Sequence, residues 1–486
     1  MIEWADTPPT FDFYIGMIFM KKILSVFLSI LFVVNIVPLF TAFAANDFVV
    51  DDGVLVKYNG SATAVTIPSE VTSIADEAFA GNTKIASVAM HNGVLSIGNK
   101  AFYGCTALKT VSLADNVTYV GALAFVNTKY LDDSTAQYLT IGKVLVDYNG
   151  TSKTPVIPDS VISIAPYAFL RNKTITSVTI PDNVTTVSEG AFYECTALAT
   201  VNGAQNVTYV GADSFTSTKW LGSKSEFVTL GDGILIAYKG TATDIVVPET
   251  VKQIAPNAFY KNTSIKKVII PASVFVIGER AFLGCSKLSE LKISEGLQLI
   301  NNEAFANCTS LSAFESPKSL RKISKGAFIN CTAIKNVKLT GTNLDIGYGA
   351  FAYCTSMKYA LLSSEVSVIG ESAFEGNTAL LYVTVPREII NIQSNCFKGC
   401  SKLTAICDID SVCASVLSTE VMLSHNRGDA DMDKKVTVID ATTIQFYLAG
   451  IKSISDTALP FADADFDTSV SILDATYIQK FAAGLM

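Results

Sequence analysis

The chain is poor in the residues that most active sites and nucleic-acid surfaces require. Its 486 residues include only two histidines, two tryptophans and 16% charged residues. So little histidine argues against a histidine-based zinc site or a Ser–His–Asp triad, and so little tryptophan argues weakly against an aromatic platform for sugars. A net charge of −8 makes a nucleic-acid partner improbable. With 49% hydrophobic residues, the chain is not disordered, and these absences lean away from an enzyme.

The first 44 residues predict an export signal. A basic start at residues 20–22 is followed by an apolar stretch at residues 23–37 and small residues at Ala42 and Ala44, which is the secretory pattern. Residues 1–19 have no place in it, so we expect translation to start at Met20. The alternative is an uncleaved membrane anchor, because the apolar region is about 18 residues long. We expect cleavage near Ala44 and a secreted mature protein without a membrane span.

A phenylalanine recurs every 23 residues through the middle of the chain, with two longer gaps of 44. Ile or Val always lies five residues before it, Leu, Ile or Met six residues after it, and Asn, Cys or Thr three residues after it. A fixed period of this length predicts a solenoid, since each coil can bury its apolar face only against its neighbours. The thirteen phenylalanines are Phe79, Phe102, Phe125, Phe169, Phe192, Phe215, Phe259, Phe282, Phe305, Phe328, Phe351, Phe374 and Phe397.

The alternating apolar residues that follow each phenylalanine, such as Leu291 and Ile293, predict a short strand. Equivalent strands of successive coils are expected to stack into one parallel sheet, roughly 60 Å long at about 4.8 Å per strand. The Ala-Phe pair is expected to turn the chain on the opposite side, with phenylalanine in the core. The Asn, Cys or Thr position is expected to satisfy backbone groups at the bend.

This pattern resembles the BspA-like leucine-rich repeat family. The matching stretches run from Ile67 to Ile85 and from Ile270 to Leu288, and the resemblance covers residues 45–407. It implies a β-rich leucine-rich repeat solenoid in a secreted or surface protein that binds another macromolecule. Family membership indicates the fold much better than the ligand.

A longer period of 90 residues is nested in the repeat and relates Tyr58, Tyr148 and Tyr238. Each tyrosine ends an alternating apolar segment that is followed by a glycine turn, which predicts a β-hairpin inserted between blocks of coils. A duplication product that decorates the solenoid edge is one interpretation. A binding role for these insertions is the other.

Ten cysteines in an exported chain raise the question of disulfides. Seven occupy the repeat position that Asn and Thr also fill, so we expect free, buried thiols there. Whether Cys396, Cys407 and Cys413 are free or disulfide-bonded stays undecided. No C-x-x-C pair supports a thiol-redox or zinc-ribbon site. The seven are Cys105, Cys195, Cys285, Cys308, Cys331, Cys354 and Cys400.

Two acidic segments 34 residues apart follow a predicted cap or linker at residues 408–427. Each places aspartates at the first, third, fifth and twelfth positions of a loop, the spacing of an EF-hand that wraps oxygen ligands around Ca²⁺. The seventh position would supply a backbone carbonyl, and the ninth a hydroxyl or a bound water. The sequence therefore predicts two Ca²⁺ sites, formed by Asp429, Asp431, Asp433, Lys435, Thr437 and Asp440, and by Asp463, Asp465, Asp467, Ser469, Ser471 and Asp474.

Residues 428–486 resemble a type I dockerin, a small helical module with duplicated EF-hand-like loops that docks onto a cohesin domain of a scaffold protein. Lys434 and Thr468 replace the glycine usual at the sixth loop position, which predicts weaker calcium binding. The resemblance implies cohesin contacts at Val438, Ile439, Gln445, Phe446, Ile472, Leu473, Gln479 and Lys480. Many type I dockerins carry hydroxyl residues at the first pair, so the apolar pairs here predict a cohesin with an apolar patch. Alternatively these side chains fill the module's own core.

Together these features favour a secreted, non-catalytic protein that binds a macromolecule through its solenoid. Its dockerin would fix it, with Ca²⁺, to a cohesin scaffold in a cellulosome-like complex for polysaccharide degradation. The alternatives are a carbohydrate-binding component, with Lys292, Glu315 and Lys338 or Tyr359 and Tyr382 on the strand face, and a glycoside hydrolase. Hydrolysis needs two carboxylates at a set separation, and no such pair stands out in the coils.

Overall fold

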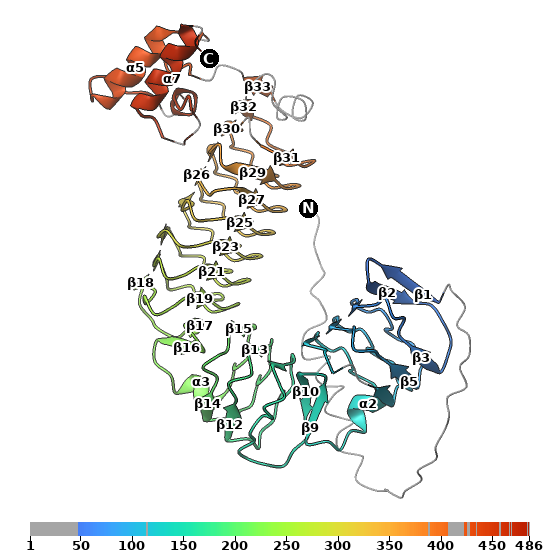
Figure 1. The fold of residues 1–486 in the computed structure, drawn as a ribbon. Helices are drawn as coiled ribbons and strands as arrows, with labels where there is room; N and C mark the ends of the chain where they lie inside the picture. Colours follow the sequence, from blue (N-terminus) through green and yellow to red (C-terminus); the bar gives the residue numbers. More distant parts are fainter. Residues whose placement is uncertain are drawn as a thin grey trace, which may run out of the picture. The chain divides into compact units, whose positions relative to one another are not determined.

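The computed structural model describes residues 47–112, 115–386, 389–406, 422–424, 428–433, 435–455, 458–465, 467, 469–483 and 485. The predicted export signal, Cys407, Cys413, Lys434 and Thr468 lie outside the described residues, as does most of the segment 408–427. The chain divides into two units, Met1–Lys224 and Ser225–Met486, and Figure 1 shows stacked coils in each.

The first unit holds two blocks of coils, and each block begins with an antiparallel hairpin whose second strand continues into a parallel sheet. The first block contains β1 (Phe48–Asp51), β2 (Val54–Tyr58), β4 (Ser73–Ile74), β6 (Ser96–Ile97) and β8 (Tyr119–Val120), with β3 (Ala64–Thr66), β5 (Ser87–Ala89) and β7 (Thr110–Ser112) in a second sheet. The second block contains β9 (Tyr138–Ile141), β10 (Val144–Tyr148), β11 (Ser163–Ile164), β13 (Thr186–Val187) and β15 (Tyr209–Val210), with β12 (Ser177–Ile180) and β14 (Thr200–Gly203) in a second sheet. The one-turn helices α2 (Lys129–Asp132) and α3 (Lys219–Gly222) follow the last coil of each block.

The second unit repeats this plan over more coils and ends in a helical module. Its first sheet contains β16 (Phe227–Leu230), β17 (Ile234–Tyr238), β19 (Gln253–Ile254), β21 (Val276–Ile277), β23 (Leu299–Ile300), β25 (Lys322–Ile323), β27 (Leu344–Ile346), β29 (Val366–Ile369) and β31 (Asn391–Ile392). The strands opposite are β18 (Asp244–Val246), β20 (Lys267–Ile270), β22 (Glu290–Ile293), β24 (Ala313–Glu315), β26 (Asn336–Leu339), β28 (Tyr359–Leu362), β30 (Tyr382–Thr384), β32 (Thr404–Ile406) and β33 (Met422–Ser424). The module contains α5 (Val438–Leu448), α6 (Leu459–Ala462) and α7 (Ile472–Ala482).

The parallel-sheet solenoid predicted from the repeat is confirmed, with three differences. The predicted strand follows eleven of the thirteen phenylalanines, whereas the helices α2 and α3 follow Phe125 and Phe215. The strands form separate sheets rather than one continuous sheet. A second parallel sheet, formed around the Ile or Val five residues before each phenylalanine, was not predicted, because two-residue strands leave no alternation to detect. The hairpins are not edge decorations, since β2, β10 and β17 pair in parallel with the first coil of their block.

The repeated phenylalanines form continuous aromatic stacks inside the coils. Phe328 lies 5.1 Å from Phe305 and 5.0 Å from Phe351, measured between ring centroids, and its ring is within 9° of parallel to both. Each hairpin tyrosine begins a stack, as Tyr148 does at 5.0 Å from Phe169. Each such contact adds about 0.5–1.5 kcal/mol to the apolar burial of the rings. The period of 90 residues therefore marks where a stack starts.

The Asn, Cys or Thr position satisfies backbone carbonyls, as predicted. The Cys105 thiol donates to the carbonyl oxygen of Phe79 in the preceding coil at 3.1 Å, and the Asn377 amide donates to that of Phe351 at the same distance. Thr128 instead donates to Phe125 and caps α2. Asn172 instead accepts the N–H groups of Thr174 and Ile175 at 3.0 and 3.1 Å. Interchange among these residues thus follows from their shared ability to hydrogen-bond backbone groups at the bend.

The predicted free, buried thiols are confirmed for all seven repeat cysteines, and Cys396 is also buried and forms no disulfide. Burial is the largest effect on the thiol pKa of Cys105, which rises to about 11, and of Cys285, which rises to about 12. These thiols stay protonated at neutral pH and act as small hydrogen-bond donors in the core.

Candidate calcium and docking site

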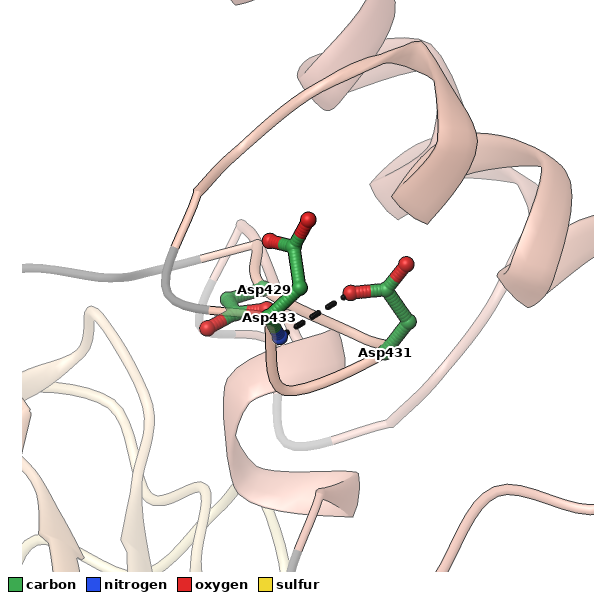
Figure 2. A group of neighbouring side chains, drawn as sticks. All are labelled: Asp429, Asp431 and Asp433. Atoms are coloured by element: carbon green, nitrogen blue, oxygen red, sulfur yellow. Dashed lines mark hydrogen bonds between the residues drawn. The ribbon is translucent and has the colours of Figure 1, made fainter.

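Each predicted calcium loop brings three carboxylates together. Oxygens of Asp429, Asp431 and Asp433 lie within 4.8 Å of one another, and Figure 2 shows these side chains around one turn of the loop. The backbone N–H of Asp433 donates to carboxylate oxygens of Asp429 at 3.0 Å and Asp431 at 3.1 Å, which holds the loop tightly curved. Asp463, Asp465 and Asp467 form the equivalent group in the second loop.

The aspartates at the twelfth position tie each loop to the helix that follows it. Asp440 accepts hydrogen bonds from the N–H groups of Asp431 and Thr437 at 3.1 and 2.8 Å. Asp474 accepts from those of Ala464, Asp465 and Ser471 at 2.6, 3.1 and 2.7 Å. Both carboxyl groups are fully buried. Burial, opposed by these hydrogen bonds, raises the pKa of Asp440, and it raises that of Asp474 to about 6.

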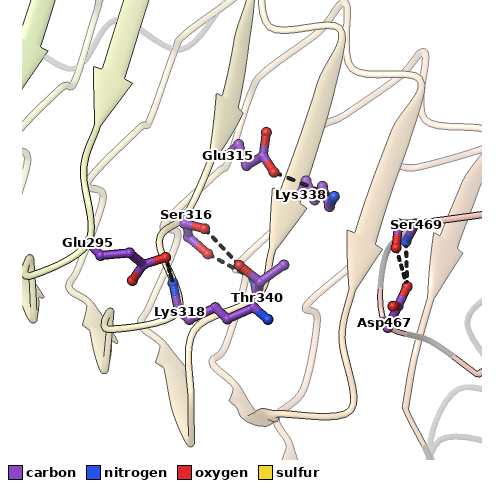
Figure 3. A network of polar contacts seen from close by, with 8 residues as sticks. All are labelled: Glu295, Glu315, Ser316, Lys318, Lys338, Thr340, Asp467 and Ser469. Atoms are coloured by element: carbon purple, nitrogen blue, oxygen red, sulfur yellow. Dashed lines mark hydrogen bonds and ion pairs between the residues drawn. The ribbon is translucent and has the colours of Figure 1, made fainter.

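The residues predicted at the seventh and ninth positions lie within the loops and at the helix starts. Lys435 and Ser469 donate their backbone N–H groups to Asp433 and Asp467, both at 2.8 Å, and Figure 3 shows the contact of Ser469. The ninth residues, Thr437 and Ser471, are the N-caps of α5 and α7, each within a capping box. Their roles as ligands stay predictions.

The donor set of both loops fits Ca²⁺. All the converging side-chain groups are carboxylates, and hard oxygen ligands are those that Ca²⁺ prefers. Three ionised carboxylates this close repel one another unless a cation lies between them. Since Thr437 and Ser471 both end a loop and begin a helix, an ion bound in the loop would also fix the start of that helix.

The residues predicted to contact cohesin are mostly exposed. Val438, Ile439, Ile472 and Leu473 have exposed fractions of 58, 59, 56 and 60%, so they do not fill the module's core. That core is formed by other residues, among them Ala441, Ile444, Ala475 and Ile478. Phe446, Gln479 and Lys480 are exposed and Gln445 is half-buried. Sequence reasoning did not single out Leu448, Ile451, Phe481 and Leu485, which are also exposed.

The charged row on the solenoid strands consists of ion pairs. Lys338 pairs with Glu315 across neighbouring strands at 3.4 Å, and Figure 3 shows this pair beside other contacts between coils. Lys292 pairs at 3.3 Å with Glu290 of its own strand. Exposed pairs of this kind contribute about 0–1 kcal/mol each. They give no indication of a ligand.

The tyrosine row near the end of the solenoid contacts the helical module. Tyr359 and Tyr382 stack with ring centroids 6.2 Å apart. Phe461 of α6 meets Tyr382 edge to face at 5.1 Å and is 95% buried, together with Ile406. Tyr382 thus packs within the protein rather than standing free as a sugar platform.

Comparison with protein families agrees with this architecture. The family model described as the BspA type leucine rich repeat region matches residues 57–143, 139–224, 236–358, 277–404 and 344–446, well over half of the chain. The chain belongs to the BspA-type leucine-rich repeat family. The model of the dockerin type I domain matches residues 427–481, so this BspA-type protein carries a type I dockerin at its C-terminal end. Leucine-rich repeats and dockerins are both non-catalytic kinds of domain.

Several solved structures resemble the chain in fold. A leucine-rich repeat protein from Bacteroides ovatus is 24% identical, covers 75% of this chain and 91% of its own, and has a TM-score of 0.32. A leucine rich cell surface protein from Faecalibacterium prausnitzii is 22% identical, covers 78% of this chain and 98% of its own, and has a TM-score of 0.28. The pneumococcal vaccine antigen PcpA is 16% identical, covers 78% of this chain and 97% of its own, and has a TM-score of 0.31. No curated protein matches the chain.

Helices are short throughout the described part of the chain. None of them is both long and apolar enough to cross a membrane.

Proposed function

We propose that the protein is a secreted, non-catalytic binding protein that docks, in a calcium-dependent manner, onto the cohesin domain of a scaffold. The observation that carries this proposal is the exposure of Val438, Ile439, Ile472 and Leu473, here called the apolar quartet, at the tenth and eleventh positions of the two acidic loops. Exposed apolar side chains in such a small module mark an interaction surface. The dockerin supports cohesin as the partner.

Calcium would act on docking through helix geometry. In each loop the residue just before the apolar pair caps the helix, and the buried aspartate just after the pair accepts N–H groups from the loop. Three carboxylates that repel one another cannot hold this arrangement firmly alone, whereas an ion bound by them would. The apolar quartet would therefore be correctly presented only when the loops hold Ca²⁺.

The two copies offer equivalent surfaces, so one of them could suffice for docking. The first copy continues from its pair into Gln445 and Phe446, and the second into Gln479 and Lys480. An aromatic ring in one and an ammonium in the other would let the two copies differ in the cohesins that they prefer.

The experiment is binding of the full chain to a panel of recombinant type I cohesins in Ca²⁺, measured by surface plasmon resonance. Val438→Asp with Ile439→Asp should leave binding through the second copy within about threefold, whereas adding Ile472→Asp and Leu473→Asp should abolish it. Ile451→Ser is the matched control, since Ile451 is 71% exposed but outside the apolar quartet. Unchanged cohesin binding by the variant that carries all four substitutions contradicts the proposal.

The solenoid would supply the second binding activity, toward a protein or glycan, in the polysaccharide-degrading context that the dockerin suggests. A glycan gains little support from the strand face, since its charged row forms ion pairs and Tyr382 packs against Phe461. Pull-down of the full chain with plant polysaccharides and, separately, with cell-surface proteins distinguishes the two ligand classes.

A further inference from the structure

A ladder of backbone hydrogen bonds joins the turns of successive coils. Where one coil follows another directly, the phenylalanine and the residues two before and two after it donate their N–H groups to carbonyls of the next coil. In the second coil the pairs are Lys100 to Ala122, Phe102 to Ala124 and Gly104 to Val126, at 2.8, 2.8 and 2.9 Å.

The ladder stops at the coil of Phe125, where the chain inserts α2 and the hairpin β9–β10 before the coil of Phe169. Within the part of the chain that the structure describes, the N–H groups of Leu123, Phe125 and Asn127 make no hydrogen bond. The side-chain amide of Asn127 also has no hydrogen-bond partner among those residues. These three residues, here called the donor wall, leave a row of N–H groups to be paired from outside the chain.

The hairpin and the coil of Phe169 present acceptors to the same space. Tyr148 of β10 donates its N–H to the carbonyl of Ala168 at 3.1 Å, so the hairpin covers the middle of this turn. The carbonyls of Pro166 and Leu170, on either side of Ala168, accept no hydrogen bond from any described residue. Asp147, next to Tyr148, carries a carboxyl group and is only 9% exposed. Pro166, Leu170 and Asp147 are here called the acceptor wall.

A cavity of about 300 Å³ lies between the two walls, and all six of their residues line it. Apolar side chains complete the lining, among them Leu131, Val146 and Phe169. Small-molecule sites are mostly apolar concavities with a few convergent polar groups, and this volume is at the lower end of their range. The space that the hairpin leaves therefore has the build of a small-molecule site.

The charges of the lining disfavour an ionic ligand. Asp132 and Asp147 would repel an anion, and the guanidinium of Arg171 is engaged with Glu194 at 2.7 Å. A cation would meet the N–H groups of the donor wall, which repel positive charge. A purely apolar molecule would leave the backbone groups of both walls without a partner, which is costly once water is displaced.

Hydroxyl groups satisfy both walls at once. Each hydroxyl donates one hydrogen bond and accepts others, so a neutral molecule with several hydroxyls can pair with donors on one side and acceptors on the other. The C–H faces of a sugar ring would match the apolar part of the lining. A saccharide therefore fits this cavity better than an ion or a hydrocarbon.

We propose that this cavity binds a small neutral saccharide, either a free mono- or disaccharide or the end of a longer chain. This assignment gives a site and a ligand class to the solenoid's binding activity proposed above, and it rests on that activity. The sugar hydroxyls would accept from the N–H groups of the donor wall and donate to the carbonyls and the carboxylate of the acceptor wall.

The test begins with a panel of glucose, xylose, galactose, mannose, cellobiose and xylobiose, screened against the full chain by saturation-transfer NMR and measured by calorimetry. Val146→Trp fills the cavity and should weaken binding at least tenfold. Val56→Trp is the matched control, because Val56 holds the equivalent place in the hairpin β1–β2, is 43% exposed and does not line the cavity. Circular dichroism verifies that both variants fold.

Asn127→Gly removes the free amide without backbone strain. Asn127 has a φ of 60°, and glycine with a φ of 71° already fills the equivalent place at Gly104. The variant should weaken binding at least threefold. Asn330→Gly is the matched control, since Asn330 has the same φ and hydrogen-bonds Asn307 far along the chain from the cavity.

Hydrogen exchange gives a readout that needs no variant. The amides of Leu123, Phe125 and Asn127 should exchange freely in the unliganded chain and at least tenfold more slowly with saturating sugar. The same sugar with every hydroxyl methylated should bind at least tenfold more weakly, because it no longer donates hydrogen bonds.

Three results overturn the proposal: no saturable binding of any sugar, binding that survives Val146→Trp, or binding that leaves these amides unprotected. None of them bears on cohesin docking, which is measured on the dockerin, or on capture of a protein by the rest of the solenoid. Failure of the saccharide site is therefore distinguishable from failure of the proposed function.

Discussion

The coils and the calcium loops treat their polar groups in opposite ways. In the coils, the polar group at the bend pairs with a backbone carbonyl of the preceding coil, as the Cys105 thiol does with that of Phe79. In the loops, carboxylates of the same charge converge, and apolar side chains such as Ile439 stand in solvent beside them. Both arrangements repeat along the sequence with equal regularity. Regularity alone therefore does not distinguish the structural coils from a binding site. Polar groups without a partner in the chain do mark the binding site.

The sharpest contrast is between a core phenylalanine and an exposed one. Phe328→Ala should lower the free energy of unfolding of the solenoid by about 3–5 kcal/mol, because it removes a fully buried ring with stacked neighbours on both sides. Phe446→Ala, at a 44% exposed position of α5, should change it by less than about 0.5 kcal/mol. Urea denaturation followed by circular dichroism measures both. Equal losses would remove the distinction between core and docking surface.

Removal of calcium should affect only one side of the comparison. EGTA, or Asp429→Ala with Asp463→Ala, should abolish a stabilisation of the dockerin of about 2.7 kcal/mol, the value for an ion at one hundred times its Kd. The solenoid contains neither loop, so its melting transition should not move. Differential scanning calorimetry resolves the two transitions. A dockerin transition that is insensitive to calcium would show that the carboxylate groups hold no ion.

Cysteine substitutions test whether the coils depend on internal hydrogen bonds. Cys331 donates its thiol to the Phe305 carbonyl at 3.1 Å, and the same carbonyl accepts the N–H of Cys308 at 3.2 Å. Cys331→Val should therefore cost about 0.5–1.5 kcal/mol by removing one of the two hydrogen bonds of that carbonyl. Cys331→Asn should cost less, because Asn377 makes the same hydrogen bond in its own coil. Thermal melts of both variants provide the comparison. A more stable valine variant would show that the position is selected only for size.

The smallest effect concerns pH. The unfolded chain loses its thiol protons near the ordinary pKa of 9.0, whereas folded Cys105 and Cys285 retain theirs to a pKa of about 11 and about 12. Folding stability that is complete below pH 9 should therefore fall as the pH rises above it. Iodoacetamide at pH 8 should label both residues in urea and neither in the native protein, as read by mass spectrometry. Rapid native labelling would contradict the buried, protonated state.

Strong periodicity explains how much of this structure the sequence could predict. The phenylalanine positions, the strand pattern and the carboxylate spacing each recur along the chain. Because each pattern recurs, a single sequence is enough to show that it does not arise by chance. The two-residue strands around Ile74 and its equivalents were missed, because their pairing comes from stacking and not from local preference. The contact between Phe461 and Tyr382 was also missed. It joins residues that share no repeat, and no pattern in the sequence relates them.

The central claim is that the function of the C-terminal module lies in calcium-dependent docking through the apolar quartet. The most direct measurement is the affinity of the full chain for a recombinant type I cohesin by surface plasmon resonance, first in Ca²⁺ and then in EGTA on the same surface. The account predicts binding in Ca²⁺ that falls at least a hundredfold in EGTA and returns when Ca²⁺ is restored. Equal affinity in both buffers, for every cohesin that binds, would contradict it.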